Sequence, residues 1–133
     1  MSAPLSELTH KISLARAIAM TQRYRQQKHN VIKKEFAHIL PLSETFNRAA
    51  FDRLLSQAGC AGVRIYYSMD EELQLHTIIV GVNANNEDLL PVAAMSAPKE
   101  TAAQTTTAGS DGEILEEAQV CPPSCSPASP LNT

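Results

Sequence analysis

Tryptophan and long apolar runs are absent from this chain, and aromatic residues make up only 5% of its 133 positions. Aliphatic side chains must therefore supply most of any core. No apolar run approaches the ~20 residues of a membrane-spanning helix, and the first residues lack the basic and apolar segments of a signal peptide. We therefore expect a cytoplasmic protein that engages no membrane, with its three cysteines as reduced thiols.

Catalytic motifs are also missing. The sequence has no glycine-rich phosphate loop, no H-E-x-x-H pair and no spacing typical of a Ser/His/Asp triad. This absence favours a non-enzymatic protein, although it does not exclude an enzyme. No cofactor is indicated, and zinc is the only metal that the cysteines suggest.

Charge is divided unevenly along the chain. Residues 1–58 contain nine Lys or Arg and four Asp or Glu, whereas residues 59–133 contain two and ten, giving +5 and −8. We interpret this as two halves of one domain that attract each other; the alternative is a basic surface for an acidic partner. A nucleic-acid partner is disfavoured, because no recognition motif accompanies the basic residues and a solvated helix face explains them. These residues are Arg16, Arg23, Arg25, Lys28, Lys33 and Lys34.

Two helices are predicted in the first half. Ser13 is a suitable N-cap for a helix over residues 14–28, where apolar side chains recur at three- and four-residue spacing. Residues 31–40 add a turn or two of helix before Pro41, and residues 41–45 form a connector. A second helix from about residue 46 or 47 to 57 precedes Gly59, which suits the left-handed conformation after a helix.

A β-hairpin follows Gly59. Val63, Ile65 and Tyr67 share one face of its first strand, and we expect them to be buried. Residues 69–72 form the loop. The second strand, residues 75–82, is apolar on both faces and is predicted to be an inner strand. An isolated hairpin is marginal in water, so a third strand is needed, and residues 113–120 are the only good candidate.

These elements predict an α+β fold in which N-terminal helices pack on a small antiparallel sheet made of the hairpin plus one strand. Residues 1–12 are a lead-in, and residues 13–90 with 113–120 form a single domain. Residues 91–112, rich in Ala, Thr, Ser and Gly, are predicted to be a disordered insertion. Residues 121–133 form a proline-rich tail that we expect to be extended or disordered.

The most distinctive short motif is Cys121-Pro122-Pro123-Ser124-Cys125. In a polyproline II conformation its two cysteine Cα atoms would lie ~12 Å apart. A disulfide needs roughly 4.4–6.8 Å, so a bridge requires a turn or a cis proline. We expect free tail thiols first, a disulfide or redox pair second, and a zinc site completed by Cys60 and His76 third. Cys60, Cys121 and Cys125 are the candidate thiol site, although Cys60 alone fits a small buried hydrophobe.

Polar residues of the hairpin form a second candidate site. Arg64, Tyr66 and His76 are predicted to share a sheet face, with no evident carboxylate partner. A histidine in such a strand is more often a core or rim residue than a ligand. Residues 83–88 carry oxygen-bearing side chains similar to those of a calcium loop, but the glycine and glutamate needed at its sixth and twelfth positions are missing, which favours a turn.

Four stretches of the chain resemble small uncharacterised proteins of Bacteroidota bacteria. They are residues 17–25, 59–67, 79–85 and 121–125, and the resemblance covers most of residues 13–125 apart from the low-complexity insertion. Its specific parts are the Gly-Cys-x-Gly-x-Arg strand and the Cys-Pro-Pro-x-Cys motif. The family tends to have a glycine among the asparagines after the second strand, where this chain has Asn85 and Asn86. The resemblance implies a bacterial, cytoplasmic protein and supplies no activity.

The function expected from the sequence is therefore general. We predict a small non-enzymatic binding or accessory module that uses the exposed sheet face or the tail to engage a protein partner. The alternative is a thiol redox or metal-binding protein built from Cys121 and Cys125 with help from Cys60.

Overall fold

Strand β3 (Leu75–Val82) is the centre of the fold, because three other strands pair with it. The computed structural model of the protein describes residues 3–91 and 112–133, which fall into two units. The first unit comprises Met1–Glu7, Phe46–Tyr67 and Thr77–Glu117, and the second comprises Leu8–Thr45, Ser68–His76 and Ala118–Thr133. The predicted disordered insertion, apart from its end residues, lies outside the described residues.

The main sheet has the order β2-β3-β4, with β5 also paired to β3. β2 spans Gly62–Met69, β4 spans Asp88–Leu89 and β5 spans Ile114–Leu115. β4 and β5 pair antiparallel with successive residues of β3, Gly81 standing opposite Leu89 and Val80 opposite Ile114. The prediction that residues 75–82 form an inner strand is confirmed.

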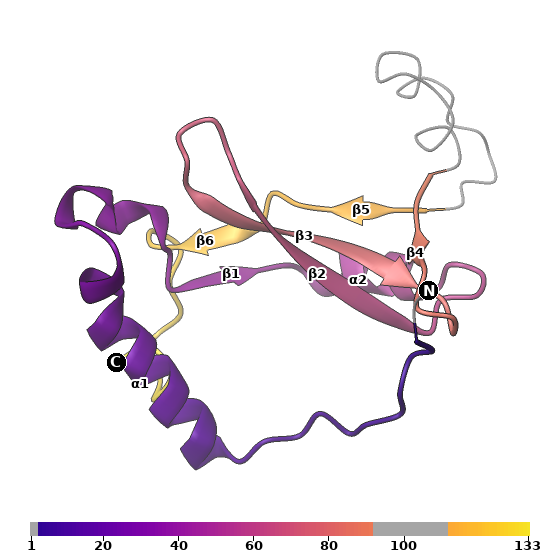
Figure 1. Cartoon of the computed structure of the whole chain (residues 1–133), viewed down its shortest axis with the longest axis horizontal. Coiled ribbons are helices and arrows are strands. Elements are labelled where there is room, and N and C mark those ends of the chain that lie inside the picture. Colours follow the sequence, from indigo (N-terminus) through magenta and orange to yellow (C-terminus); the bar gives the residue numbers. More distant parts are fainter. Residues whose placement is uncertain (1–2, 92–111) are drawn as a thin grey trace. The chain divides into compact units, whose positions relative to one another are not determined.

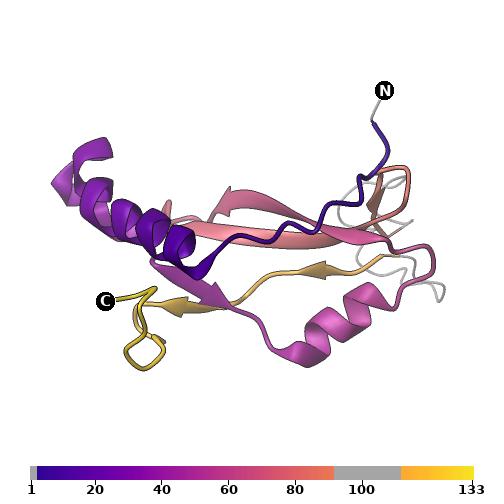
Figure 2. The same cartoon turned by 90° about the horizontal axis from the view of Figure 1, so that it is seen from below.

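The core of the first unit lies between this sheet and helix α2 (Arg48–Leu55). Leu54 of the helix is fully buried and packs with Ile79 and Leu115. Phe46 and Phe51 pack against this cluster with their rings edge to face, 5.9 Å between centroids. Figure 2 shows α2 on one side of β3 and β5. The helix begins at Arg48, next to the predicted start, because the Asn47 side chain accepts a hydrogen bond from the amide of Ala50 and caps it.

The second unit contains helix α1 (Leu14–Val31), the 3₁₀ helix η1 (Lys34–Ile39) and a two-stranded sheet of β1 (Ser43–Thr45) and β6 (Gln119–Cys121). The antiparallel pair β1–β6 is visible in Figure 1. Ser13 caps α1 as predicted, accepting from the amide of Arg16. The Tyr24 hydroxyl donates to the Pro41 carbonyl at 2.6 Å, which fixes the chain after η1 to the helix.

The α+β class is confirmed, but two details of the prediction are wrong. Residues 41–45 are not a simple connector, because they contain β1. Residues 113–120 are not one strand. Glu117 has a positive φ of 66°, which breaks the extended backbone between β5 in the main sheet and β6 in the small one.

The tail also differs from the expected extended segment. It contains turns, including a hydrogen bond from the Asn132 amide to the Ser129 carbonyl, and the guanidinium of Arg25 donates to the Thr133 carbonyl oxygen at 2.7 Å. In residues 3–91 and 112–133, no helix combines the length and apolarity that crossing a membrane requires.

Candidate binding surface on strand β2

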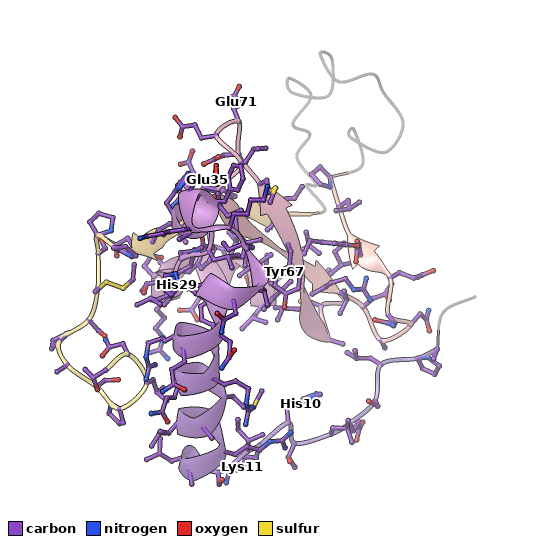
Figure 3. The ribbon with its side chains drawn as sticks, turned by 60° about the vertical axis from the view of Figure 1, so that its left-hand side comes forward. His10, Lys11, His29, Glu35, Tyr67 and Glu71 are labelled. Atoms are coloured by element: carbon purple, nitrogen blue, oxygen red, sulfur yellow. A yellow bond between two sulfur atoms is a disulfide. The ribbon has the colours of Figure 1, made fainter. Side chains whose placement is uncertain are left out.

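Strand β2 presents an apolar row to solvent. Val63, Ile65 and Tyr67 are 38%, 51% and 79% exposed, so the expectation that they are buried is wrong. Tyr67 is labelled in Figure 3. Because successive side chains of a strand alternate between faces, these three residues lie on the same side of the sheet. We call Val63, Ile65 and Tyr67 the apolar row.

The side of the sheet that carries the apolar row follows from the contacts of two glycines. A Cβ on Gly62 would lie 3.6 Å from Val82, whereas a Cβ on Gly81 would lie 2.9 Å from the Cys60 sulfur. Gly62 and Val82 therefore share one face, and the apolar row shares the opposite face with Gly81 and Ile79. This is the face on which α2 packs.

Helix α2 is too short to cover the whole of that face. Its eight residues give a length of about 12 Å. Leu54 covers Ile79 and Leu115. The apolar row on β2 is left without a covering element among the described residues.

The backbone of β2 is open along its outer edge. The strand is last in the order β2-β3-β4, and within residues 3–91 and 112–133 no strand pairs with its other side. The amide of Asp70 donates to the carbonyl of Gln74 across the hairpin. In an antiparallel ladder the residues that bond the neighbouring strand alternate, so Val63, Ile65 and Tyr67 turn their N–H and C=O groups outward.

Arg64 and Tyr66 occupy the other face of β2 and meet at Asp88. The guanidinium of Arg64 forms an ion pair with Asp88 and also donates to Asn86, and the Tyr66 hydroxyl donates to the second oxygen of Asp88. The hydrogen bond to Asp88 is the main cause of a raised pKa for Tyr66. These contacts attach β2 to β4 across β3.

His76, the third member of the predicted polar face, has carboxylate partners of its own. Its Nδ1 lies 2.9 Å from Glu44 and its Nε2 lies 2.9 Å from Asp70. The imidazolium form is the one in which both ring nitrogens donate to these carboxylates at the same time. Amide donation from Gln74, followed by the bond to His76, lowers the pKa of Asp70. Glu71 marks the tip of this hairpin in Figure 3.

The two tail cysteines are bonded to each other. Cys121 and Cys125 form a disulfide with their Cα atoms 4.6 Å apart, drawn as a yellow bond in Figure 3. The expectation of free tail thiols is therefore wrong. The Ser124 amide donates to the Val120 carbonyl, so the turn that can bring the two cysteines together is present.

Cys60 is a free, half-buried thiol that donates to the carbonyl of Gly62 at 3.3 Å. No group of three or more His, Cys, Asp or Glu side chains suited to a metal ion occurs in the part of the chain that the structure describes. Residues 83–87 form the predicted turn, in which the Asn83 side chain accepts from the amides of Asn85 and Glu87.

Sequence reasoning missed two parts of this surface. Asp88 was not identified as the partner of Arg64 and Tyr66, although the turn at residues 83–87 returns the chain beside β3 and could have indicated it. The exposure of the apolar row had no local signal. The chain matches no protein-family model, no curated protein and no solved structure, so the resemblance to Bacteroidota proteins stays a prediction.

Proposed function

We propose that the chain is a non-enzymatic binding module that accepts a β-strand of a protein partner along the outer edge of β2. The observation that carries this proposal is the coincidence of an open backbone edge with the exposed apolar row on the same strand. In strand addition, main-chain hydrogen bonds supply affinity and the side-chain row supplies specificity. β2 is eight residues long, enough for several such bonds.

The rest of the first unit supports a binding role. Arg64 and Tyr66 tie β2 to β4 through Asp88, so the edge belongs to a braced sheet rather than to a loose hairpin. A strand held in its extended conformation loses less entropy on binding than a flexible segment does.

The experiment compares proteins retained from source-cell lysate by the wild-type chain and by Ile65→Lys, with Met20→Lys on α1 as the matched control. Both positions are exposed, so both variants should keep the circular dichroism spectrum and the melting temperature of the wild type. We expect Ile65→Lys to reduce retention of the specific partner at least tenfold, since binding of the partner strand would remove the lysine ammonium group from water. Met20→Lys should retain it.

Hydrogen–deuterium exchange then distinguishes strand addition from side-chain contact alone. With the purified partner bound, the outward amides of Val63, Ile65 and Tyr67 should exchange more slowly. Unchanged exchange there, or equal retention by Ile65→Lys, would contradict the proposed function.

A thiol–disulfide function is the second candidate, and the bonded pair Cys121–Cys125 favours it. Cys121 is buried and Cys125 is exposed, so an incoming thiolate would attack the Cys125 sulfur and release the Cys121 thiolate. A second thiol of the reductant would then release Cys125, so two thiols are oxidised to one disulfide while the protein pair gains two electrons and two protons. In the cytoplasm expected from the sequence, such pairs are typically catalytic or redox-sensing. The participation of Cys60 stays a prediction.

The measurement for this second candidate is equilibration in glutathione buffers, followed by alkylation and mass spectrometry. A reduction potential above about −300 mV would support a reactive pair, and a lower one would indicate a structural disulfide. Cys60→Ser should leave the value unchanged if the pair acts alone.

A further inference from the structure

The outer edge of β2 lacks the features that keep edge strands apart. Natural edges are blunted by proline, by lysine, by inward-pointing charges or by shortness. β2 has eight residues and neither proline nor lysine. Its one charged residue, Arg64, is paired with Asp88 on the face away from the apolar row. Nothing on this edge therefore opposes pairing with a strand of the same sequence.

We propose that β2 pairs antiparallel with β2 of a second copy of this chain, with Ile65 on the two-fold axis. The proposal rests on the proposed function, because it uses the same open edge and names the occupant. Two-fold pairing places each Ile65 opposite its symmetry mate and each Val63 opposite the partner subunit's Tyr67. All three residues turn their backbone groups outward, so these pairs are the hydrogen-bonded ones.

Side-chain chemistry selects this register. A shift by one residue would place the apolar row opposite the partner subunit's Arg64 and the partner subunit's Tyr66, and the apolar side chains would no longer face each other. Centring the axis on Arg64 would set two guanidinium groups opposite each other, which is unfavourable. Centring it on Ile65 sets Arg64 opposite the partner subunit's Tyr66, so that no like charges face each other.

The result is one continuous sheet in the order β4-β3-β2-β2-β3-β4, with the two apolar rows adjacent on one face. Symmetric pairing of identical patches is the commonest form of protein self-association. Because each copy contributes one strand, the interface is smaller than the standard size of roughly 1,600 Å². We therefore expect a weak dimer that dissociates on dilution.

Sedimentation equilibrium of the whole chain over a wide concentration range tests the dimer. The mass should rise from the 14.4 kDa of the monomer toward twice that value as concentration increases. Ile65→Lys should remain monomeric at every concentration, since it would place two ammonium groups opposite each other, and Met20→Lys should associate like the wild type. A wild-type chain that stays monomeric, or association that survives Ile65→Lys, overturns the proposal.

Cysteine substitution tests the register. Paired residues on the axis have Cα atoms about 5.5 Å apart, within disulfide reach, so Ile65→Cys should give a reducible covalent dimer under mild oxidation. The two copies of Val63→Cys would be separated by about 13 Å along the strands and should not cross-link. The wild-type chain is the control, because any cross-link that it forms must come from its own cysteines, such as the free Cys60. Efficient cross-linking of Val63→Cys, or of Tyr66→Cys in place of Ile65→Cys, overturns the register.

Failure of the dimer is distinguishable from failure of the proposed function. If the chain is monomeric but Ile65→Lys still loses a lysate partner, β2 binds another protein and only the dimer fails. If the chain is monomeric and Ile65→Lys retains every partner, both proposals fail.

Discussion

β2 and β3 are the two strands of one hairpin, and they have the same length, but β3 is apolar on both faces whereas β2 carries an apolar row on one face and Arg64 and Tyr66 on the other. Their environments are nevertheless opposite. Ile79, Val80, Gly81 and Val82 of β3 are all buried, whereas the apolar row of β2 is exposed. Residue type indicated that β3 enters the core, but it did not indicate that the apolar row of β2 stays exposed.

The difference comes from neighbours that are distant in sequence. β3 has β2, β4 and β5 as pairing partners, and α2 packs against it through Leu54. β2 has only β3. A strand with one neighbour has an unpaired edge and a partly uncovered face. β2 is such a strand, and its outer edge and apolar row are accessible to solvent.

The sharpest test of this comparison replaces the same residue type on each strand. Ile79→Ala should lower the free energy of unfolding by about 2–5 kcal/mol, because it removes buried methyl groups from the cluster with Leu54 and Leu115. Ile65→Ala should cost less than about 1 kcal/mol, because Ile65 is half exposed. Urea unfolding measures both losses, at a protein concentration low enough that β2 does not pair with a second copy of the chain. Equal losses would contradict the exposure of the apolar row.

The glycines of the two strands provide a second, smaller contrast. Gly81→Ala would bring a Cβ to 2.9 Å from the Cys60 sulfur and 3.0 Å from the Gln57 amide nitrogen, and such overpacking should cost about 1–3 kcal/mol. Gly62→Ala would meet the end of the Leu5 side chain at 3.0 Å, which can rotate away, and Val82 at 3.6 Å, an ordinary van der Waals distance, so its cost should be smaller. Thermal unfolding compares the two.

Relief by a second substitution identifies the cause of the Gly81→Ala loss. Cys60→Ala removes the sulfur that the new methyl group would meet, so the double variant should recover part of the stability. If the double variant recovers nothing, the Cys60 sulfur is not the cause of the loss, which leaves the contact with the Gln57 amide or the backbone conformation.

Local patterns predicted the parts of this fold that local physics determines. Ser13 and Asn47 cap helices because their side chains accept amide hydrogen bonds within the same segment. Residues 75–82 are apolar on both faces, which indicated an inner strand with a neighbour on each edge. The third strand predicted for this reason is present in part, as β5.

The features that escaped prediction depend on contacts between distant segments. β1 and β6 are too short to show a strand pattern and exist through their pairing with each other. The break at Glu117 is a single backbone conformation that the residue type does not demand. The exposure of β2 reflects the limited length of α2, and the link from Arg64 and Tyr66 to Asp88 depends on the register of β4.

The smallest predicted effect concerns Tyr66, whose hydrogen bond to Asp88 joins the edge strand to β4 across β3. This bond raises the pKa of Tyr66 above its ordinary value of about 10. A raised pKa in the folded state means that the bond stabilises the protein fully below the unfolded pKa, and that this stabilisation disappears as pH rises through the folded value. Between neutral and strongly alkaline pH, the wild type should therefore lose more stability than Tyr66→Phe.

Ultraviolet titration of tyrosine ionisation isolates the cause. In Asp88→Asn the transition of Tyr66 should move to lower pH, because the negative acceptor of its hydroxyl proton is removed. Glu87→Gln is the matched control: it removes the same charge from the adjacent residue, which bonds Asn83 instead of Tyr66. A shift of equal size in both variants would show that the overall charge of the β4 region, and not the bond from β2 to Asp88, sets the ionisation of Tyr66.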